Sequence, residues 1–278
     1  MLEPFLKWPG GKRWLVQRYG HLFPADFCRY FEPFLGSGAV FFHLMPRRAI
    51  LSDTNPELVN AYRCMRDHAV EINRRLTCLH RRHTELVYYR MRNKKPSDPV
   101  ARAVRFIYLN RTCFNGIYRV NLKGMFNVPM GSKNLVEYPN GFLEQVSCSL
   151  KGVSIRHSDF EVVLDEASEG DLVFVDPPYT VMHNYNNFRK YNSSLFSWTD
   201  QIRLASAIKR AARRGALIML ANADHQSVRD LYGGFGFHHR ISRASVLAAE
   251  SKHRRRTTEL LVTSFETRDS DQGDGAYG

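Results

Sequence analysis

The sequence predicts an α/β protein with a helical lobe inserted into its core. Residues 49–53 and 171–175 are short apolar runs beside an acidic residue, as expected for buried strands. The turn Gly36-Ser37-Gly38 stands between an apolar segment and a helical pattern, which is typical of a strand–turn–helix unit. Residues 63–105 are dense in basic side chains and poor in glycine, and they predict two or three helices outside the sheet.

These patterns also predict a division of the chain. We expect residues 1–55 and 145–266 to form the core and residues 56–144 the inserted lobe, which Asn55 and Pro56 open as N-cap and first helical residue. The polar, glycine-rich stretch 267–278 is predicted to be disordered.

The charge of the chain points to a polyanionic partner. The 278 residues carry 40 Lys and Arg against 27 Asp and Glu, a formal net charge of +13. Duplex DNA, RNA and an anionic membrane surface all fit this excess, and a basic surface kept for solubility is the plainer alternative. No apolar run approaches the ~20 residues of a membrane helix, and the N-terminus lacks a signal-peptide core. We therefore expect a soluble, cytoplasmic or nucleoid-associated protein.

Metal and disulfide chemistry is not expected. The 5 cysteines are scattered and none forms a CxxC pair. His80 and His83 have HxxH spacing within an arginine-rich stretch, where a solvated helix face is favoured over a metal site.

Two segments near the N-terminus predict a small-molecule site. Trp8 and Lys12 flank the tight turn Pro9-Gly10-Gly11, which suits a flat or anionic ligand, although a packed tryptophan explains the pattern equally well. Asp53 ends the strand about twenty residues after the glycines of the second turn, where a carboxylate binds a ribose diol. No third glycine is placed for a pyrophosphate, which favours a nucleoside cofactor without phosphates.

The inserted lobe carries a predicted β-hairpin. Residues 117–120 and 125–128 are β-prone runs joined by a four-residue turn, and basic and aromatic side chains alternate along them. A two-stranded ribbon fits the DNA major groove, where Arg pairs with guanine. An ordinary surface hairpin is the simpler alternative, but the interleaved aromatic and basic residues and the overall charge favour a nucleic-acid contact.

The second half of the chain predicts the rest of the core. We expect a strand at 153–158 that ends at Asp159 and Phe160, which could border a pocket or form a structural turn. Residues 180–197 are expected to form a long loop or lid, and Thr199 to cap a helix that ends at Arg214. Further strands are expected at 216–221 and 260–262, and a basic loop at 240–256.

The segment Asp176-Pro177-Pro178-Tyr179 directly follows the apolar run 171–175. Two prolines cannot continue a sheet ladder, so the chain leaves the strand in an extended turn. The turn offers a carboxylate, free carbonyls and a flat ring, a suitable receptor for a planar group with an exocyclic amine.

In this order, FLKWPGGK, FEPFLGSG, LSDTN, the hairpin block LNRTCFNGIYRVNLKGMFNVPMG and DPPY resemble the Dam-type (D12 class, alpha group) DNA adenine-N6 methyltransferases over nearly the whole chain. The resemblance implies an S-adenosylmethionine-dependent, Rossmann-like fold with a mixed seven-stranded sheet and one antiparallel edge. It also implies transfer of a methyl group from S-adenosyl-L-methionine to N6 of a flipped adenine in duplex DNA, with GATC as the expected site.

The resemblance assigns roles by position. The catalytic residues would be Asp176, Pro177, Pro178 and Tyr179. The cofactor would contact Trp8, Lys12, Glu32, Pro33, Phe34, Gly36, Gly38, Asp53, Asp159, Phe160 and Asp176. DNA would contact Arg111, Phe114, Asn115, Ile117, Arg119, Asn127 and Pro129. We expect a monomer, with a dimer on DNA as the alternative.

Two other functions remain open at this point. One is methylation of cytosine N4 or of RNA, which the tetrapeptide permits and the hairpin block argues against. The other is a noncatalytic DNA-binding relative, against which the intact Trp8, Gly36, Gly38, Asp53 and Asp176 argue. A solitary regulator, a phage enzyme and one half of a restriction-modification system are equally compatible with the sequence.

Overall fold

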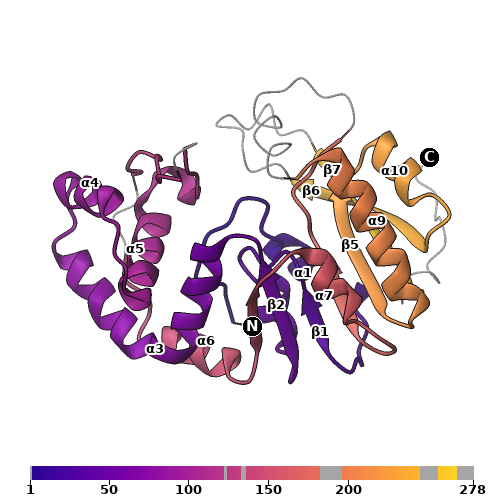
Figure 1. Cartoon of the computed structure of the whole chain (residues 1–278), viewed down its shortest axis with the longest axis horizontal. Helices are drawn as coiled ribbons and strands as arrows, with labels where there is room; N and C mark the ends of the chain where they lie inside the picture. The colour runs from indigo at the N-terminus through magenta and orange to yellow at the C-terminus, as the bar shows by residue number, and fades with distance from the viewer. Residues whose placement is uncertain (1, 122–123, 133–135, 182–195, 245–255, 268–278) are drawn as a thin grey trace. The chain divides into compact units, whose positions relative to one another are not determined.

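The structure of the chain is a computed structural model that describes residues 2–121, 124–132, 136–181, 196–244 and 256–267 (Figure 1). Its contacts divide the chain into two compact units. Unit 1 comprises Met1–Arg13, Leu35–Pro46 and Leu51–His157, and unit 2 comprises Trp14–Phe34, Arg47–Ile50 and Ser158–Gly278. The predicted division at residues 55 and 145 stays a prediction.

The strands form one mixed seven-stranded sheet in the order β3-β2-β1-β4-β5-β7-β6. They are β1 (Tyr30–Glu32), β2 (Ala49–Asp53), β3 (Ser154–His157), β4 (Leu172–Val175), β5 (Leu217–Ala223), β6 (Phe237–Ala244) and β7 (Arg256–Thr263). β4 is parallel to β1 and to β5, and β7 is antiparallel to β5 and to β6. The α/β class and the mixed seven-stranded sheet are confirmed.

The position of the antiparallel strand corrects one expectation. The resemblance implied an antiparallel edge, but β7 lies between β5 and the edge strand β6. Because β7 runs opposite to both neighbours, β6 has the same direction as β5. β7, the last strand in the chain, therefore lies between two strands that run parallel to each other. Residues 240–244, predicted as part of a basic loop, belong to β6.

Unit 2 holds a large hydrophobic core. Its helices are α1 (Arg13–Tyr19), the 3-10 turn η1 (Gly20–Leu22), α7 (Phe160–Asp165), α9 (Trp198–Arg213) and α10 (Gln226–Tyr232). The helix α9 buries Leu204, Ala205 and Ile208 against the fully buried apolar residues of β4 and β5. Burial of a leucine or isoleucine side chain such as Leu204 or Ile208 contributes about 1.5–3 kcal/mol.

The start of α9 differs from the prediction. Ser197, not Thr199, is the N-cap: its hydroxyl accepts from the Asp200 N–H, and the Asp200 carboxylate accepts from the Ser197 N–H. This reciprocal capping box requires an acidic or amide residue three positions after the cap, which Ser197 has and Thr199 lacks. The helix ends as predicted before Gly215, whose φ of 87° favours glycine.

Unit 1 gathers the helices of the predicted lobe (Figure 1). Those of the lobe are α3 (Pro56–Arg81), α4 (Glu85–Asn93), α5 (Pro99–Thr112), the 3-10 turn η2 (Phe114–Gly116) and α6 (Phe142–Leu150), which continues past the predicted end of the lobe at residue 144. The unit also contains α2 (Ala39–Leu44), which belongs to the predicted core. Asn55 caps α3 by accepting from the N–H groups of Glu57 and Leu58, which confirms the predicted helix start. The helices predicted over residues 63–105 are confirmed as α3, α4 and the first half of α5.

Three predictions lie largely outside the described residues. Residues 182–195 of the predicted loop at 180–197, residues 245–255 of the predicted basic loop and residues 268–278 of the predicted tail are not described. Within the described residues, no helix combines the length and hydrophobicity that a membrane crossing requires.

Candidate active site

In unit 1, the N-terminal turn packs against the glycine loop. The Gly11 N–H donates to the Trp8 carbonyl at 3.1 Å, closing the turn, and Gly10 has a φ of 80°. The Trp8 ring lies directly against Gly36: a Cβ built on Gly36 would come within 2.8 Å of Cδ1 of the indole. Gly36 itself has a φ of 48°, so both its conformation and its neighbour require glycine. The structure therefore brings Trp8 and Gly36 together, as a cofactor site built from both would require.

Asp53 fixes the same glycine loop. Its Oδ2 accepts from the Gly36 N–H at 3.2 Å and its Oδ1 from the Asn55 N–H at 2.9 Å. Burial raises the pKa of this carboxyl above its ordinary value, and the two backbone N–H groups offset part of that rise. An acid at the end of β2 is thus tied to the loop after β1.

Two further predicted residues lie in the same region. Lys12 is buried, and its Nζ donates to the Gly10 carbonyl at 3.0 Å. Gly38 has a φ of 63° at the N-cap of α2, and a Cβ there would come within 2.9 Å of the Tyr62 hydroxyl. Both residues therefore support the fold of the two turns.

In unit 2, Asp176-Pro177-Pro178-Tyr179 follows the last residue of β4 without helix or strand, as predicted. All four residues of β4 are buried, whereas Asp176, Pro178 and Tyr179 are half-buried. The Tyr179 hydroxyl donates to Oε2 of Glu259 on β7 at 2.6 Å. The segment thus stands at the carboxyl end of a buried parallel strand, where α/β sheets bind ligands.

An aromatic group lies beside the start of α7 in the same unit. The rings of Phe34 and Phe160 are stacked with centroids 5.4 Å apart, and Phe196 meets both edge-on. Two neighbouring predicted residues, Glu32 and Pro33, precede this group, and Oε2 of the buried Glu32 accepts from the Tyr30 hydroxyl at 2.9 Å. Phe160 and Phe196 are buried in this group, whereas Phe34 is half-buried and keeps part of its ring accessible.

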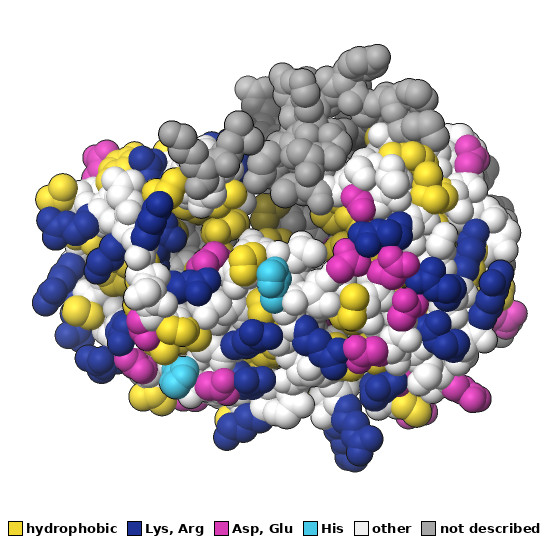
Figure 2. Space-filling view, in the orientation of Figure 1, with side chains coloured by type: hydrophobic (Ala, Val, Ile, Leu, Met, Phe, Trp, Pro, Cys, Tyr) yellow, Lys and Arg dark blue, Asp and Glu magenta, His cyan; other side chains and the backbone are white. Residues whose placement is uncertain are grey.

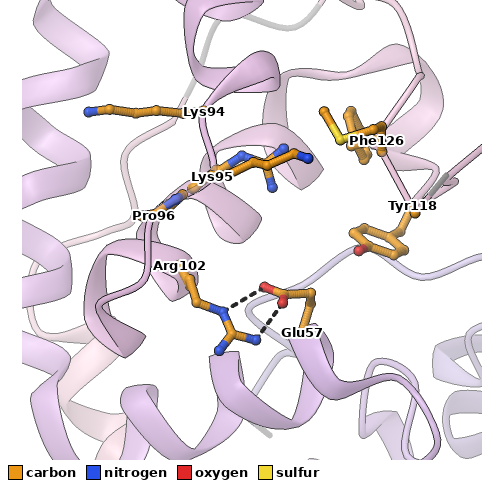
Figure 3. A pocket seen from close by; sticks show the side chains of 10 residues that line it. Glu57, Lys94, Lys95, Pro96, Arg102, Tyr118 and Phe126 are labelled. Carbon is orange, nitrogen blue, oxygen red and sulfur yellow. Dashed lines mark hydrogen bonds and ion pairs between the residues drawn. The ribbon is translucent and has the colours of Figure 1, made fainter.

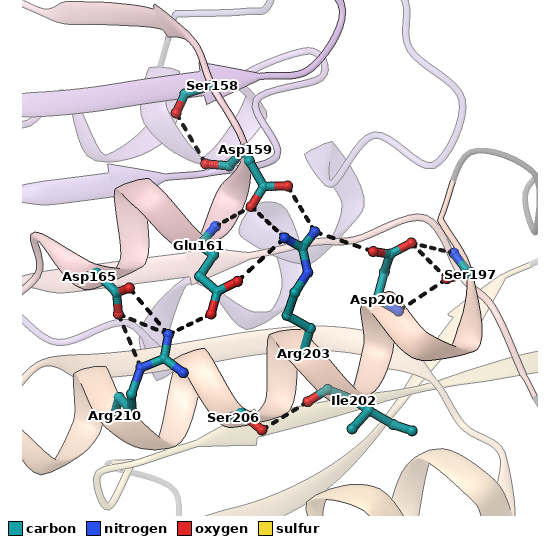
Figure 4. Close-up of polar contacts among 10 residues, drawn as sticks. All are labelled: Ser158, Asp159, Glu161, Asp165, Ser197, Asp200, Ile202, Arg203, Ser206 and Arg210. Carbon is teal, nitrogen blue, oxygen red and sulfur yellow. Dashed lines mark hydrogen bonds and ion pairs between the residues drawn. The ribbon is translucent and has the colours of Figure 1, made fainter.

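Asp159 is engaged in a charged network (Figure 4). Its carboxylate caps α7 by accepting from the Glu161 N–H at 2.9 Å, and it pairs through both oxygens with Arg203 of α9. The Arg203 guanidinium also reaches Asp200 and lies 4.4 Å from the centre of the Phe160 ring. A bidentate pair of this kind holds the carboxylate in a fixed direction.

In unit 1, the predicted hairpin forms with a short ladder. Val120 bridges Phe126, the Asn127 N–H donates to the Arg119 carbonyl at 3.2 Å, and the Asn121 N–H donates to the Met125 carbonyl at 2.8 Å. The pairing is confirmed, but these bridges are isolated and the runs 117–120 and 125–128 are not continuous strands.

The predicted DNA-contact residues stand on this hairpin and its base. Phe114, Asn115, Arg119, Asn127 and Pro129 are exposed, and Ile117 and Arg111 are half-buried. Phe114 keeps 52% of its surface accessible. The Arg119 Nε donates to Asn127 Oδ1 at 3.0 Å across the hairpin. Arg111 instead contacts the protein: it donates to the Glu137 carbonyl and lies over the Tyr138 ring.

A basic pocket of about 200 Å³ adjoins the hairpin in unit 1 (Figure 3). It is lined by Glu57, Lys94, Lys95, Pro96, Arg102, Arg105, Tyr118, Gly124, Met125 and Phe126. Arg102 pairs with Glu57, and Arg105 donates to the carbonyls of Met91 and Arg92. Figure 2 shows further Lys and Arg side chains over α3 and α4, at the left of the view. The surface of this unit suits a polyanion.

The structure also reveals residues that the sequence reasoning missed. Tyr118 stacks on Trp8 with an interplanar angle of 16°, so the hairpin and the N-terminal turn share one aromatic group. Lys7 exchanges two backbone hydrogen bonds with the buried Asn110 side chain, and its own side chain packs against Gly116. Glu259 is a third such residue: it is a buried acid of β7 that directly precedes the apolar residues Leu260, Leu261 and Val262.

Comparisons with known proteins identify the family of this chain. The family described as D12 class N6 adenine-specific DNA methyltransferase matches residues 8–246. The chain is 38% identical to the Type II methyltransferase M1.LlaDCHI of Lactococcus lactis subsp. cremoris, over 95% of this chain and 96% of that protein. It is 33% identical to the Type II methyltransferase M.MjaIII of Methanocaldococcus jannaschii, over 95% and 99% of the two chains. It is 31% identical to the DNA adenine methylase of Escherichia coli K12, over 93% and 94%. With a matching family across most of its length and relatives above 30% identity, this chain belongs to the D12 class N6 adenine-specific DNA methyltransferases.

Proposed function

We propose that this adenine-specific DNA methyltransferase modifies one adenine within a short duplex site, GATC or a related sequence. Its methyl donor is S-adenosyl-L-methionine, as in other members of the class. The observation that carries the proposal is the Asp176-Pro177-Pro178-Tyr179 segment at the carboxyl end of the buried strand β4. The shared family supports the reaction, and the exposed hairpin supports a duplex substrate.

The turns of unit 1 fit the methyl donor by their chemistry. Trp8 offers a flat ring, Asp53 a carboxylate for a ribose diol, and Gly36 a backbone free of side-chain atoms. The absence of a third glycine agrees with a ligand that carries no phosphate. Trp8, Gly36 and Asp53 would hold S-adenosyl-L-methionine, which supplies an electrophilic methyl group on a sulfonium when it is bound.

Two acceptors at the end of β4 act on the target amine. The lone pair of adenine N6 is delocalised into the ring, which makes this nitrogen a poor nucleophile. The Asp176 carboxylate and the Pro177 carbonyl accept hydrogen bonds from the two N–H groups of this amine. These bonds favour a tetrahedral nitrogen, whose lone pair then points away from the plane of the base. Tyr179 stacks on the base and holds it in place. The protein therefore contributes orientation and electrostatics, and the donor contributes the leaving group.

The target adenine must leave the helix, because N6 is engaged in the base pair. Unstacking and unpairing cost a few kcal/mol. The exposed ring of Phe114 and the half-buried Ile117 on the hairpin base offer apolar surface that offsets part of this cost. Arg119 supplies a guanidinium that can read guanine in the major groove. We propose that residues 56–144 carry this recognition function, that the protein acts as a monomer, and that it works on DNA in the cytoplasm.

The experiment that tests the proposal is direct mapping of the product. Purified protein is incubated with a labelled methyl donor and with plasmid DNA, and N6-methyladenine is located by sequencing. We expect modification at one adenine of a short motif, and faster labelling of a GATC duplex than of a CATG duplex of equal length. No N6-methyladenine at any sequence would refute the function, whereas modification at another motif would refute only the GATC assignment.

A further inference from the structure

The hydrogen bond between Tyr179 and Glu259 joins the catalytic segment to a strand eighty residues later. We propose that Glu259 is a positioning residue that holds the Tyr179 ring in the orientation that stacks on the target adenine. This inference rests on the proposed function, which gives Tyr179 its stacking role. Glu259 needs no contact with DNA or with the methyl donor to act in this way.

The bond has the properties of a strong one. Its length of 2.6 Å lies in the range of hydroxyl–carboxylate hydrogen bonds, which are about twice as strong as neutral ones. Glu259 is only 5% exposed, so water competes little for the carboxylate. The phenol oxygen is the far end of the ring, so fixing it restricts the direction of the ring's long axis and the sideways displacement of the ring.

The sheet topology places this carboxylate where it is needed. β4 is parallel to β5, with Val175 opposite Leu220, so both strands end at the same side of the sheet. β7 is antiparallel to β5, and Glu259 is paired with Ala223, the last residue of β5. Because β7 runs in the opposite direction, its early residues lie beside the carboxyl end of β5, at the same edge of the sheet as the carboxyl end of β4, which Tyr179 follows.

The strand that carries Glu259 is itself held firmly. The neighbouring Thr258 hydroxyl donates to Asp224 Oδ2 at 2.6 Å, and Arg240 Nε donates to the same oxygen at 2.6 Å. Arg229 pairs with the other oxygen of Asp224. Burial would raise the pKa of the Asp224 carboxyl, but these partners outweigh burial and lower it. A site residue supported by such a network keeps its geometry better than one on a free loop.

The test compares Glu259→Ala, Glu259→Gln and Tyr179→Phe in single-turnover methylation of a duplex with one target site. We expect Glu259→Ala and Tyr179→Phe to slow the step by a similar factor, about 10- to 100-fold, because each removes the same bond. The double variant should be no slower than the slower single variant, within about twofold. Glu259→Gln, whose amide oxygen still accepts, should recover part of the rate.

Two readouts separate positioning from general damage. Fluorescence of 2-aminopurine at the target position should rise in Glu259→Ala and Tyr179→Phe, because the flipped base is stacked less well, while the dissociation constants for DNA and methyl donor change less than about threefold. Glu266→Gln, which removes an exposed carboxylate just beyond β7, is the matched control and should behave as the wild type. If Glu259→Ala does not fold, the rates and the fluorescence of Glu259→Gln and Tyr179→Phe still test the positioning role.

Wild-type rates in both Glu259 variants, or losses that multiply in the double variant, would overturn the inference. Tyr179→Ala distinguishes this failure from failure of the proposed function. If Tyr179→Ala is deeply impaired while the Glu259 variants are normal, only the positioning role is wrong. If Tyr179→Ala is fully active, the stacking role of Tyr179 in the proposed function is wrong as well.

Discussion

The Trp8 indole occupies the space that a side chain at Gly36 would need. A Cβ at Gly36 would lie 2.8 Å from Cδ1 and 3.2 Å from Nε1 of that ring. The N-terminal turn and the loop after β1 are therefore fitted to each other at a glycine with a φ of 48°. The two segments that the sequence singled out for the cofactor depend on one contact.

Gly36→Ala should consequently weaken binding of the methyl donor. The new methyl group must displace the Trp8 ring or move the loop, and we expect the dissociation constant to rise by about tenfold or more, measured by calorimetry. Gly152→Ala is the matched control, because Gly152 also has a positive φ, of 75°, but a Cβ there would meet nothing within 4 Å. The control should lose about 1 kcal/mol of stability and keep its affinity. Equal affinity in both variants would contradict a cofactor site at Gly36.

Asp176→Ala should separate DNA binding from catalysis. The carboxylate is expected to act only on the target amine, so DNA affinity should change little, whereas single-turnover methylation should fall by about 10²- to 10³-fold or more. Asp176→Asn keeps one acceptor oxygen and should lose less. Full turnover by Asp176→Ala would remove the catalytic assignment of this residue.

Arg119→Ala should relax the recognition of one base pair. Its guanidinium is exposed and is oriented by Asn127, so its loss should reduce discrimination at that position by about 1–3 kcal/mol, measured by competition between duplexes with single substitutions. The comparison variant is Lys94→Ala, an exposed basic residue that lines the pocket beside the hairpin. That variant should weaken binding to all DNA sequences equally and lower the slope of log affinity against log salt concentration by about one. A uniform loss in Arg119→Ala would make Arg119 a phosphate contact.

Asp171→Asn should destabilise the protein in a pH-dependent way. Burial would raise the pKa of the Asp171 carboxyl, but hydrogen bonds from Arg29 and Ser168 outweigh burial and lower it. Because the pKa is lower in the folded state, ionised Asp171 stabilises the protein at pH values above its ordinary pKa of about 3.9. This contribution is lost as the pH falls through the lowered pKa of the folded state.

The variant should therefore unfold at lower urea concentration at pH 7, by about 1–2 kcal/mol, and the difference from wild type should shrink below about pH 4. Asp26→Asn removes an exposed carboxylate of the same unit and should change stability by less than about 0.5 kcal/mol. A difference that stays constant from pH 7 to pH 3 would show that the ionised Asp171 does not contribute.

The local sequence was sufficient to predict those strands and helices whose ends are fixed by residues next to them in the chain. The buried strand β4 is a run of four apolar residues, and the following prolines end it whatever lies nearby. Asn55 and Pro56 begin α3 because the cap and the fixed φ act within one turn. The spacing of the capping box at Ser197 is also present in the sequence, since Asp200 stands three residues later.

The edge strand β6 was missed for a physical reason. Its segment from Phe237 to Arg240 is polar and largely exposed, and Ile241 is the buried apolar residue that follows. An edge strand is paired on one side only, so little in its own composition distinguishes it from a loop. Pairing with β7 decides its conformation.

The sequence by itself determined the chemical groups of this protein: the carboxylate and carbonyls after β4, the glycine turns and the aromatic, basic hairpin. Only the tertiary structure decided which of them touch. The partners Tyr179 and Glu259, Asp159 and Arg203, and Trp8 and Tyr118 are 44 to more than a hundred residues apart in the chain. Such contacts depend on strand order and helix packing, because a sequence pattern reports the neighbours within one turn or strand and not those across the sheet.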